Sequence, residues 1–177
     1  TLNVRMNSIW VNGNSDVEIA ILGKYSLSII RGDNVKLDIS DLKYSNALTS
    51  INLYNKQVSG DIANLKNLTA MTSLILPNTQ VSGDIANLKS LTELVSLSLH
   101  TSQLSGDIAN LKNLTALKSI DLSNMQISGD IINLNNLNAL TSLLLYNTQV
   151  SGDIANLKNL TAITSLNLSN TQIRGDI

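Results

Sequence analysis

The tetrapeptide Ser-Gly-Asp-Ile returns at a fixed spacing through most of this chain and constrains its fold more than any other feature. It begins at Ser59 and recurs four times up to Ser151, and the segment 174–177, Arg-Gly-Asp-Ile, continues the series. The glycines therefore fall every 23 residues. At such a period each repeat is one supersecondary unit that buries its apolar side only against its neighbours. The chain is predicted to be a solenoid, in which function resides on a surface.

Residues 61–83 show what one unit contains. Apolar residues from Ile62 to Met71 are spaced by three, which is typical of a helical or 3-10 turn. Leu74 and Leu76 are spaced by two, which is typical of a short strand with alternate side chains pointing out. Each unit is predicted to be a strand, a turn and a compact return, and all strands to stack in one parallel sheet. Six units fit the period, at residues 38–60, 61–83, 84–106, 107–129, 130–152 and 153–175.

The strand segment Met71-x-x-Leu74-x-Leu76 resembles the motif of leucine-rich repeat proteins, and Val-Ser-Gly-Asp-Ile at residues 81–85 is similar to the Leu-Ser-Gly-x-Ile stretch of the plant-type class. The resemblance covers residues 38–177. It implies a right-handed α/β-type solenoid with a concave parallel β-sheet and a convex face of short helical, 3-10 and irregular turns.

Two departures from that family pattern are informative. The family usually has Asn three residues after the last strand leucine, where its side chain links neighbouring turns. Here that column is Lys56, Thr79, Ser102, Met125, Thr148 and Thr171, and we expect hydroxyls to replace part of the amide ladder. The plant pattern also has Pro after the Ile and Cys-bearing caps, and this chain has neither. Its Asn-rich, nearly identical units instead resemble exported leucine-rich repeat proteins of gut Bacteroidota, which implies a bacterial protein, secreted or at the cell surface.

The two ends of the chain depart from the period. Residues 17–21 and 27–29 alternate in polarity, and Asn12-Gly13 is typical of a hairpin turn, so residues 1–37 are predicted to be a β-rich N-terminal cap. Trp10 either covers the open core of the first unit or is an exposed contact. The sequence reaches Ile177 with no polar replacement for the leucines, so we expect the C-terminal cap to be absent and that end to be open to self-association.

Composition narrows the classes of function. The net charge is −1 and the sequence has no basic run, so no positively charged surface is expected that could bind the phosphates of nucleic acid. No apolar run approaches the roughly 20 residues of a membrane span. The chain has no Cys and one histidine, His100, so neither disulfides nor a typical transition-metal site is expected. We find no nucleophile with an accompanying base and no Gly-rich phosphate loop. The protein is therefore predicted to be no enzyme and to use no cofactor.

Two polar columns repeat in every unit. The Asp column, from Asp61 to Asp176, stands one residue before each return segment. Repeated acidic columns bind Ca²⁺ in other solenoids, but the position favours capping of a turn whose N–H groups are free. The Gln column, from Gln57 to Gln172, is interpreted as a structural ladder in which amides bond from coil to coil.

Comparison of the units shows which outward strand positions vary. The first outward column is serine in every unit, from Ser50 to Ser165, whereas the two columns beside it differ from unit to unit. Strand alternation puts all three columns on the concave face. We predict ligand contacts in the divergent columns, with drift on an unconstrained surface as the alternative explanation. The predicted binding residues are Tyr54, Ile75, Pro77, His100, Asp121, Leu144 and Tyr146.

These observations predict a non-enzymatic binding or adhesion module that recognises a macromolecule, foremost a protein, on its concave sheet. One alternative is a structural spacer or stalk of a larger surface protein. Another is a glycan-binding module, in which Tyr54 and Tyr146 stack on sugar rings. Divergence confined to two columns favours binding, because a spacer would leave all outward columns equally free to vary.

Overall fold

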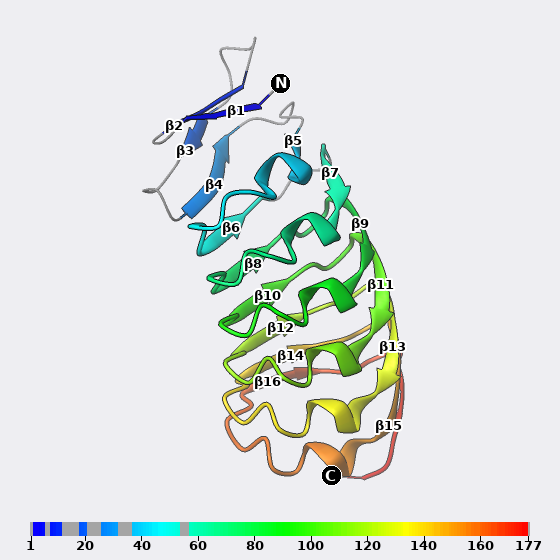
Figure 1. Ribbon diagram of the computed structural model, residues 1–177. Helices are drawn as coiled ribbons and strands as arrows, with labels where there is room; N and C mark the ends of the chain where they lie inside the picture. The colour runs from blue at the N-terminus through cyan, green and yellow to red at the C-terminus, as the bar shows by residue number, and fades with distance from the viewer. Residues whose placement is uncertain are drawn as a thin grey trace.

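The chain winds into stacked coils that cross two parallel β-sheets in turn (Figure 1). The computed structural model describes the strand residues 2–5, 8–11, 18–20 and 26–31, together with residues 37–53 and 57–176. In these ranges each coil runs from a strand of one sheet, through a turn, to a strand of the other, and returns through a 3-10 helix.

The predicted parallel sheet is present and has eight strands in the order β16-β14-β12-β10-β8-β6-β4-β3. Ser96 pairs with Ser73 on one side and with Ser119 on the other, so residues 23 apart occupy the same position in adjacent strands. Only β3 runs antiparallel to its neighbour. The strands are β3 (Glu18–Ala20), β4 (Ser26–Arg31), β6 (Ser50–Asn52), β8 (Ser73–Ile75), β10 (Ser96–Ser98), β12 (Ser119–Asp121), β14 (Ser142–Leu144) and β16 (Ser165–Asn167).

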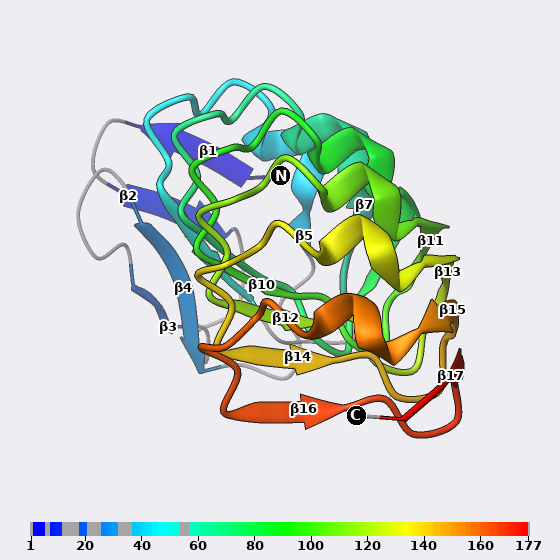
Figure 2. The same cartoon turned by 90° about the horizontal axis from the view of Figure 1, so that it is seen from below.

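A second parallel sheet of seven strands follows the first after a short turn in each coil and lies along the adjacent side of the stack (Figure 2). The prediction of a single sheet was therefore wrong. In β9, β11, β13 and β15 the segment Gln-x-Ser-Gly-Asp is extended, and its backbone groups find partners one coil away, as for Gln103 opposite Ser82. The strands are β5 (Leu37–Asp38), β7 (Val58–Asp61), β9 (Gln80–Asp84), β11 (Gln103–Asp107), β13 (Gln126–Asp130), β15 (Gln149–Asp153) and β17 (Gln172–Arg174).

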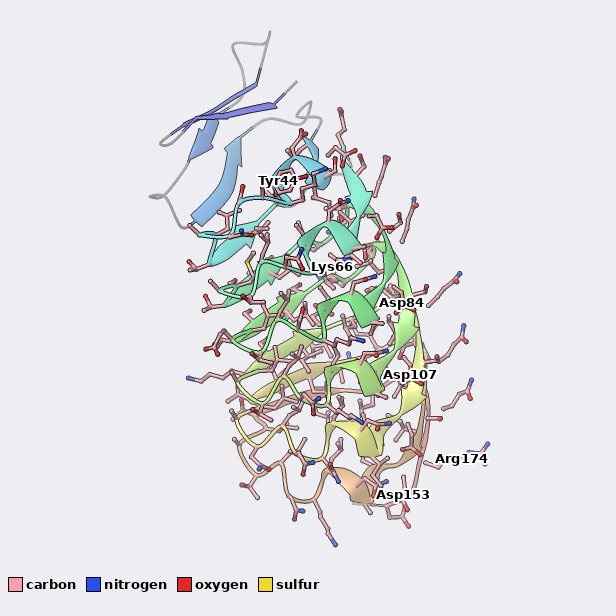
Figure 3. The ribbon with its side chains drawn as sticks, viewed as in Figure 1. Tyr44, Lys66, Asp84, Asp107, Asp153 and Arg174 are labelled. Atoms are coloured by element: carbon pink, nitrogen blue, oxygen red, sulfur yellow. The ribbon has the colours of Figure 1, made fainter. Side chains whose placement is uncertain are left out.

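Each coil returns through a four-residue 3-10 helix whose first backbone groups are capped by the Asp column. Asp84 Oδ1 accepts from the Ala86 N–H at 2.7 Å, and Asn87 Nδ2 donates to the Asp84 carbonyl at 3.0 Å. The predicted capping role is confirmed, and Figure 3 shows Asp84, Asp107 and Asp153 along one side of the stack. The helices are η1 (Ile39–Leu42), η2 (Ile62–Leu65), η3 (Ile85–Leu88), η4 (Ile108–Leu111), η5 (Ile131–Leu134) and η6 (Ile154–Leu157).

One continuous apolar core fills the space between the sheets and the 3-10 helices. The inward strand residues Leu74 and Leu76 are fully buried, as the spacing by two predicts. The last described coil is covered on one side only. Leu166 is 39% exposed there, whereas its equivalent Leu143 in the preceding coil is 0% exposed.

The described part of the N-terminal segment contributes strands to both sheets. β1 (Leu2–Arg5) pairs antiparallel with β2 (Ser8–Val11), whereas β4 adds a parallel strand beside β6 and β5 one beside β7. The predicted boundary between residues 37 and 38 therefore falls inside β5. The side chain of Trp10 and the Asn12-Gly13 turn lie outside the described residues.

Candidate functional site

The outer face of the eight-stranded sheet, here called the strand face, holds the predicted site residues in two rows. In the first row Asp121 pairs directly with Leu144, and both Asp121 and Ile75 pair with Ser98 between them. These three predicted residues end β12, β14 and β8, and each is half-buried. The strand pairing thus assembles residues that are 23 or more positions apart into one continuous row.

The second row continues past the ends of the strands because the backbone ladder does not stop there. The Leu76 N–H donates to the Ser98 carbonyl at 2.8 Å and the Asn78 N–H to the His100 carbonyl at 3.0 Å. Pro77 stands between these two donors, at a position whose N–H the ladder does not use, so its missing donor breaks no ladder bond. The same bonds place Pro77, His100 and Tyr146 in one row, with Ser123 between the last two. Tyr54 lies outside the described residues.

His100 and Asp121 contact each other between adjacent coils at the centre of the strand face. His100 Nδ1 lies 3.0 Å from Asp121 Oδ2, and the two side chains are 28% and 19% exposed. The other carboxylate oxygen, Oδ1, accepts from the Ser123 N–H at 3.1 Å. An ionised carboxylate only accepts hydrogen bonds, so Nδ1 carries the proton that it donates to Asp121. The contact holds the imidazole in one orientation on the face.

The same cluster lacks the geometry of a hydrolytic triad. Ser98 Oγ lies 3.2 Å from His100 Nδ1, the nitrogen that also contacts Asp121. A serine nucleophile needs the opposite ring nitrogen as its base while the carboxylate holds the first. Among the described residues, no group of three or more His, Cys, Asp and Glu side chains is placed to hold a metal ion.

The amide ladder that links the coils lies one column before the predicted hydroxyl column, in which Ser102 Oγ donates to Met125 Sδ of the next coil at 3.9 Å. Thr79 Oγ1 donates to the Leu76 carbonyl of its own coil at 2.9 Å and so links no coils. The ladder is formed by the preceding column, where Asn147 donates to Asn124 and Asn170 to Asn147, each at 2.7 Å. These asparagines have φ near +55°, a conformation that Asn tolerates better than most residues. The recurrence of Asn just after the strands was the feature of the sequence that could have located this ladder.

The Gln column is not the structural ladder that was predicted. Gln80, Gln103, Gln126, Gln149 and Gln172 are exposed. Across residues 57–176, no hydrogen bond reaches the side-chain amide of any of these five residues. Strand pairing brings each Gln opposite the Ser two positions beyond the neighbouring Gln, as for Gln103 and Ser82. The slip of two residues keeps consecutive amides apart, whereas the asparagines face one another directly.

A groove follows the turns that lead from the strand face to the second sheet. Its volume is about 530 Å³. Two residues of the Asn ladder form one wall, three residues of the Gln column form the other, and Ser102, Met125 and Thr148 lie between them. The lining residues are Ser102, Gln103, Leu104, Asn124, Met125, Gln126, Asn147, Thr148 and Gln149.

Comparisons with known proteins bear on the fold. No family model and no curated protein sequence matches the chain. Among solved structures, an internalin from Listeria monocytogenes is 34% identical, with 85% of this chain and 43% of the internalin covered and a TM-score of 0.69. The ectodomain of the receptor kinase GASSHO1/SCHENGEN3 from Arabidopsis thaliana is 27% identical, with 74% of this chain and 17% of the receptor covered and a TM-score of 0.62.

A further internalin, internalin C2 of Listeria monocytogenes, shows the same fold at 22% identity, with 84% of this chain and 73% of that protein covered and a TM-score of 0.64. The predicted fold class is confirmed: the chain is a leucine-rich repeat solenoid. It spans less than half the length of the first internalin and of the plant receptor. Within the described ranges, no helix has the length and apolar character needed to cross a bilayer.

Proposed function

We propose that this chain is a non-enzymatic binding module of a secreted or cell-surface protein and that it recognises another protein through the strand face. The contact residues are those of the two divergent rows: Ile75, Pro77, His100, Asp121, Leu144 and Tyr146, with Tyr54 as the seventh predicted member. The proposal keeps residues 1–37 as the N-terminal cap and residues 38–177 as the solenoid of 23-residue units. The bacterial assignment rests on composition and on the likeness to internalins.

The observation that carries the proposal is the arrangement of the strand face. A polar centre, the oriented His100–Asp121 pair, lies between apolar residues on both sides, with Ile75 two strands from Asp121 and Leu144 on the adjacent strand. Protein interfaces commonly have an apolar core with a few oriented polar groups, and aromatic anchors such as tyrosine are frequent hot spots. A structural stalk gives no reason for two rows to vary from coil to coil while the serine row beside them stays uniform.

Two structural neighbours form complexes with named partners, and this supports a protein ligand for the present chain. The GASSHO1/SCHENGEN3 ectodomain is described in complex with CASPARIAN STRIP INTEGRITY FACTOR 2. The plant peptide hormone receptor RGFR1 is described in complex with RGF2. Both ectodomains share the fold of this chain, and the proposal carries the binding role over to it at the level of fold alone.

The test begins with the whole chain on two arrays, one of secreted and cell-surface proteins and one of glycans. Each ligand found is then measured by calorimetry against Leu144→Ala and Tyr146→Ala on the strand face. The controls are Lys66→Ala and Lys112→Ala, which lie at the ends of η2 and η4 (Figure 3 labels Lys66). Loss of an interface anchor often weakens binding by about 2 kcal/mol.

A protein ligand that loses affinity with Leu144→Ala and Tyr146→Ala but not with the lysine variants supports the proposal. A glycan ligand with the same dependence would replace protein by sugar as the partner. Ligands sensitive only to the lysine variants would move the site to the 3-10 helices, and two empty arrays would favour the spacer.

A further inference from the structure

The groove between the Asn ladder and the Gln column is a second surface with binding chemistry, separate from the strand face. It spans the turns of three coils, at residues 102–104, 124–126 and 147–149 (the turn from β14 to β15 is seen in Figure 2). Its floor, between the two walls, holds the equivalent residues Ser102, Met125 and Thr148, of which Met125 and Thr148 are 5% and 6% exposed. None of its lining residues belongs to the predicted site.

The two walls of this groove differ in how their amides are used. On the Asn side, Asn147 Nδ2 donates to Asn124 Oδ1 and is therefore engaged. Asn124 Nδ2 has no such acceptor, because the preceding coil has Thr101 at that position; within residues 57–176 no bond from this nitrogen exists. On the other side Gln103 and Gln126 are exposed and unbonded. The groove therefore has a free amide donor on the Asn side and free amide donors and acceptors on the Gln side.

From Gln80 to Gln172 the Gln column stays uniform, although the side-chain amides of these five residues make no hydrogen bond within residues 57–176. Other exposed columns vary among the units: the column of Lys66 holds Asn135, and the column of Thr69 holds Asn138. The one exposed column that is equally uniform is the Asp column, which caps the 3-10 helices. An exposed position that is kept without a structural role is expected to meet something outside the chain.

We propose that this amide groove binds an extended polypeptide segment, which lies across the turns of the three coils. Side-chain amides are the same chemical group as the peptide unit, so each Gln can donate to a main-chain carbonyl and accept from a main-chain N–H. Met125 in the floor is an adaptable apolar contact for a small side chain of the segment. The site does not depend on the strand face being functional.

The lining favours a polypeptide over a sugar. Carbohydrate recognition by this chain was predicted to use tyrosines as stacking platforms, and no aromatic residue is among those that line the groove. The lining also carries no charged side chain. The chemistry that remains is amide and hydroxyl hydrogen bonding beside the apolar side chain of Met125, which suits the uncharged main chain of an extended segment.

The experiment selects random 12-residue peptides, displayed on phage, against the whole chain and measures their affinity for two double variants. Gln103→Ala with Gln126→Ala removes amides that line the groove. Gln80→Ala with Gln172→Ala removes two amides of the same column outside it, and equal melting temperatures show that both variants fold alike. We expect peptides that bind at least about tenfold more weakly to the groove variant, since two hydrogen bonds are lost, and equally well to the control.

Three results would overturn the proposal. One is a selection that yields no peptide. The second is a set of peptides that respond to Leu144→Ala and Tyr146→Ala but not to the groove variant, which would place all peptide binding on the strand face. The third is an oligosaccharide from the glycan array that loses affinity for the groove variant, which would make sugar the occupant.

Discussion

Gly83 lies directly against the capping carboxylate of Asp61 in the preceding coil. A Cβ atom at Gly83 would stand 2.5 Å from Asp61 Oδ1, the oxygen that accepts from the Ala63 N–H at 2.8 Å. The φ of Gly83 is +107°, a value that side chains disfavour. The glycine of one unit and the aspartate of the unit before it thus form one contact, which explains why the two recur together.

The first prediction follows from this contact. Gly83→Ala is expected to lower the free energy of unfolding by about 1–3 kcal/mol, because the new methyl group meets the carboxylate and the backbone becomes strained. Urea denaturation measures the loss. The control is Ser82→Ala in the same strand, whose φ is not positive, and a Gly83→Ala variant as stable as this control would contradict the packing described.

The second prediction concerns the Asp column. Asp107→Ala is expected to cost about 1 kcal/mol, as the Ala109 N–H loses its acceptor. Asp107→Asn should retain most of the stability, because Asn also caps. Thermal unfolding with calcium and with a chelator is expected to give the same Tm for the parent chain. A Tm that falls by many degrees in chelator would show that the column holds ions instead.

The third prediction is a stabilising change. Thr101 is a β-branched residue with φ +59° at a position where the neighbouring coils have Asn78 and Asn124. Thr101→Asn is expected to raise the free energy of unfolding by about 1 kcal/mol, since it relieves that backbone strain and gives Asn124 Nδ2 an acceptor.

Thr92→Asn is the matched control for the third prediction, because its exposed column already contains Asn46 and Asn138. Denaturant midpoints of both variants are compared with the parent. If Thr101→Asn is neutral or destabilising while Thr92→Asn is neutral, the ladder contributes nothing at this coil.

The fourth prediction compares two equivalent core leucines, Leu143 and Leu166, that differ in burial. Leu143→Ala is expected to cost about 2–5 kcal/mol, because the side chain is fully buried and leaves a cavity. Leu166→Ala should cost much less, since that side chain is 39% exposed. Equal losses in denaturation would mean that another chain covers the last coil in solution, as self-association through that end requires, and light scattering would then show an oligomer.

The amino-acid sequence by itself determines the features that depend on local spacing. The 23-residue period predicts the solenoid. The spacing of Leu74 and Leu76 predicts a strand segment with these two side chains pointing inward, and the position of Asp84 before its turn predicts the cap. Each depends on residues a few positions apart, whose geometry the backbone fixes directly. The same alternation places the row that contains Ile75 and Leu144 outward.

Only the tertiary structure decides which groups meet between coils. The second sheet forms because extended segments lie one coil apart, with a slip that puts Gln103 opposite Ser82, and no local pattern encodes that offset. The slip leaves the amides from Gln80 to Gln172 unbonded within residues 57–176, whereas Asn124 and Asn147 face each other and form the ladder. The contact of His100 with Asp121 also depends on how the coils stack. The stacking of the backbones determines which side chains on neighbouring coils come within hydrogen-bond distance, and distance along the chain does not.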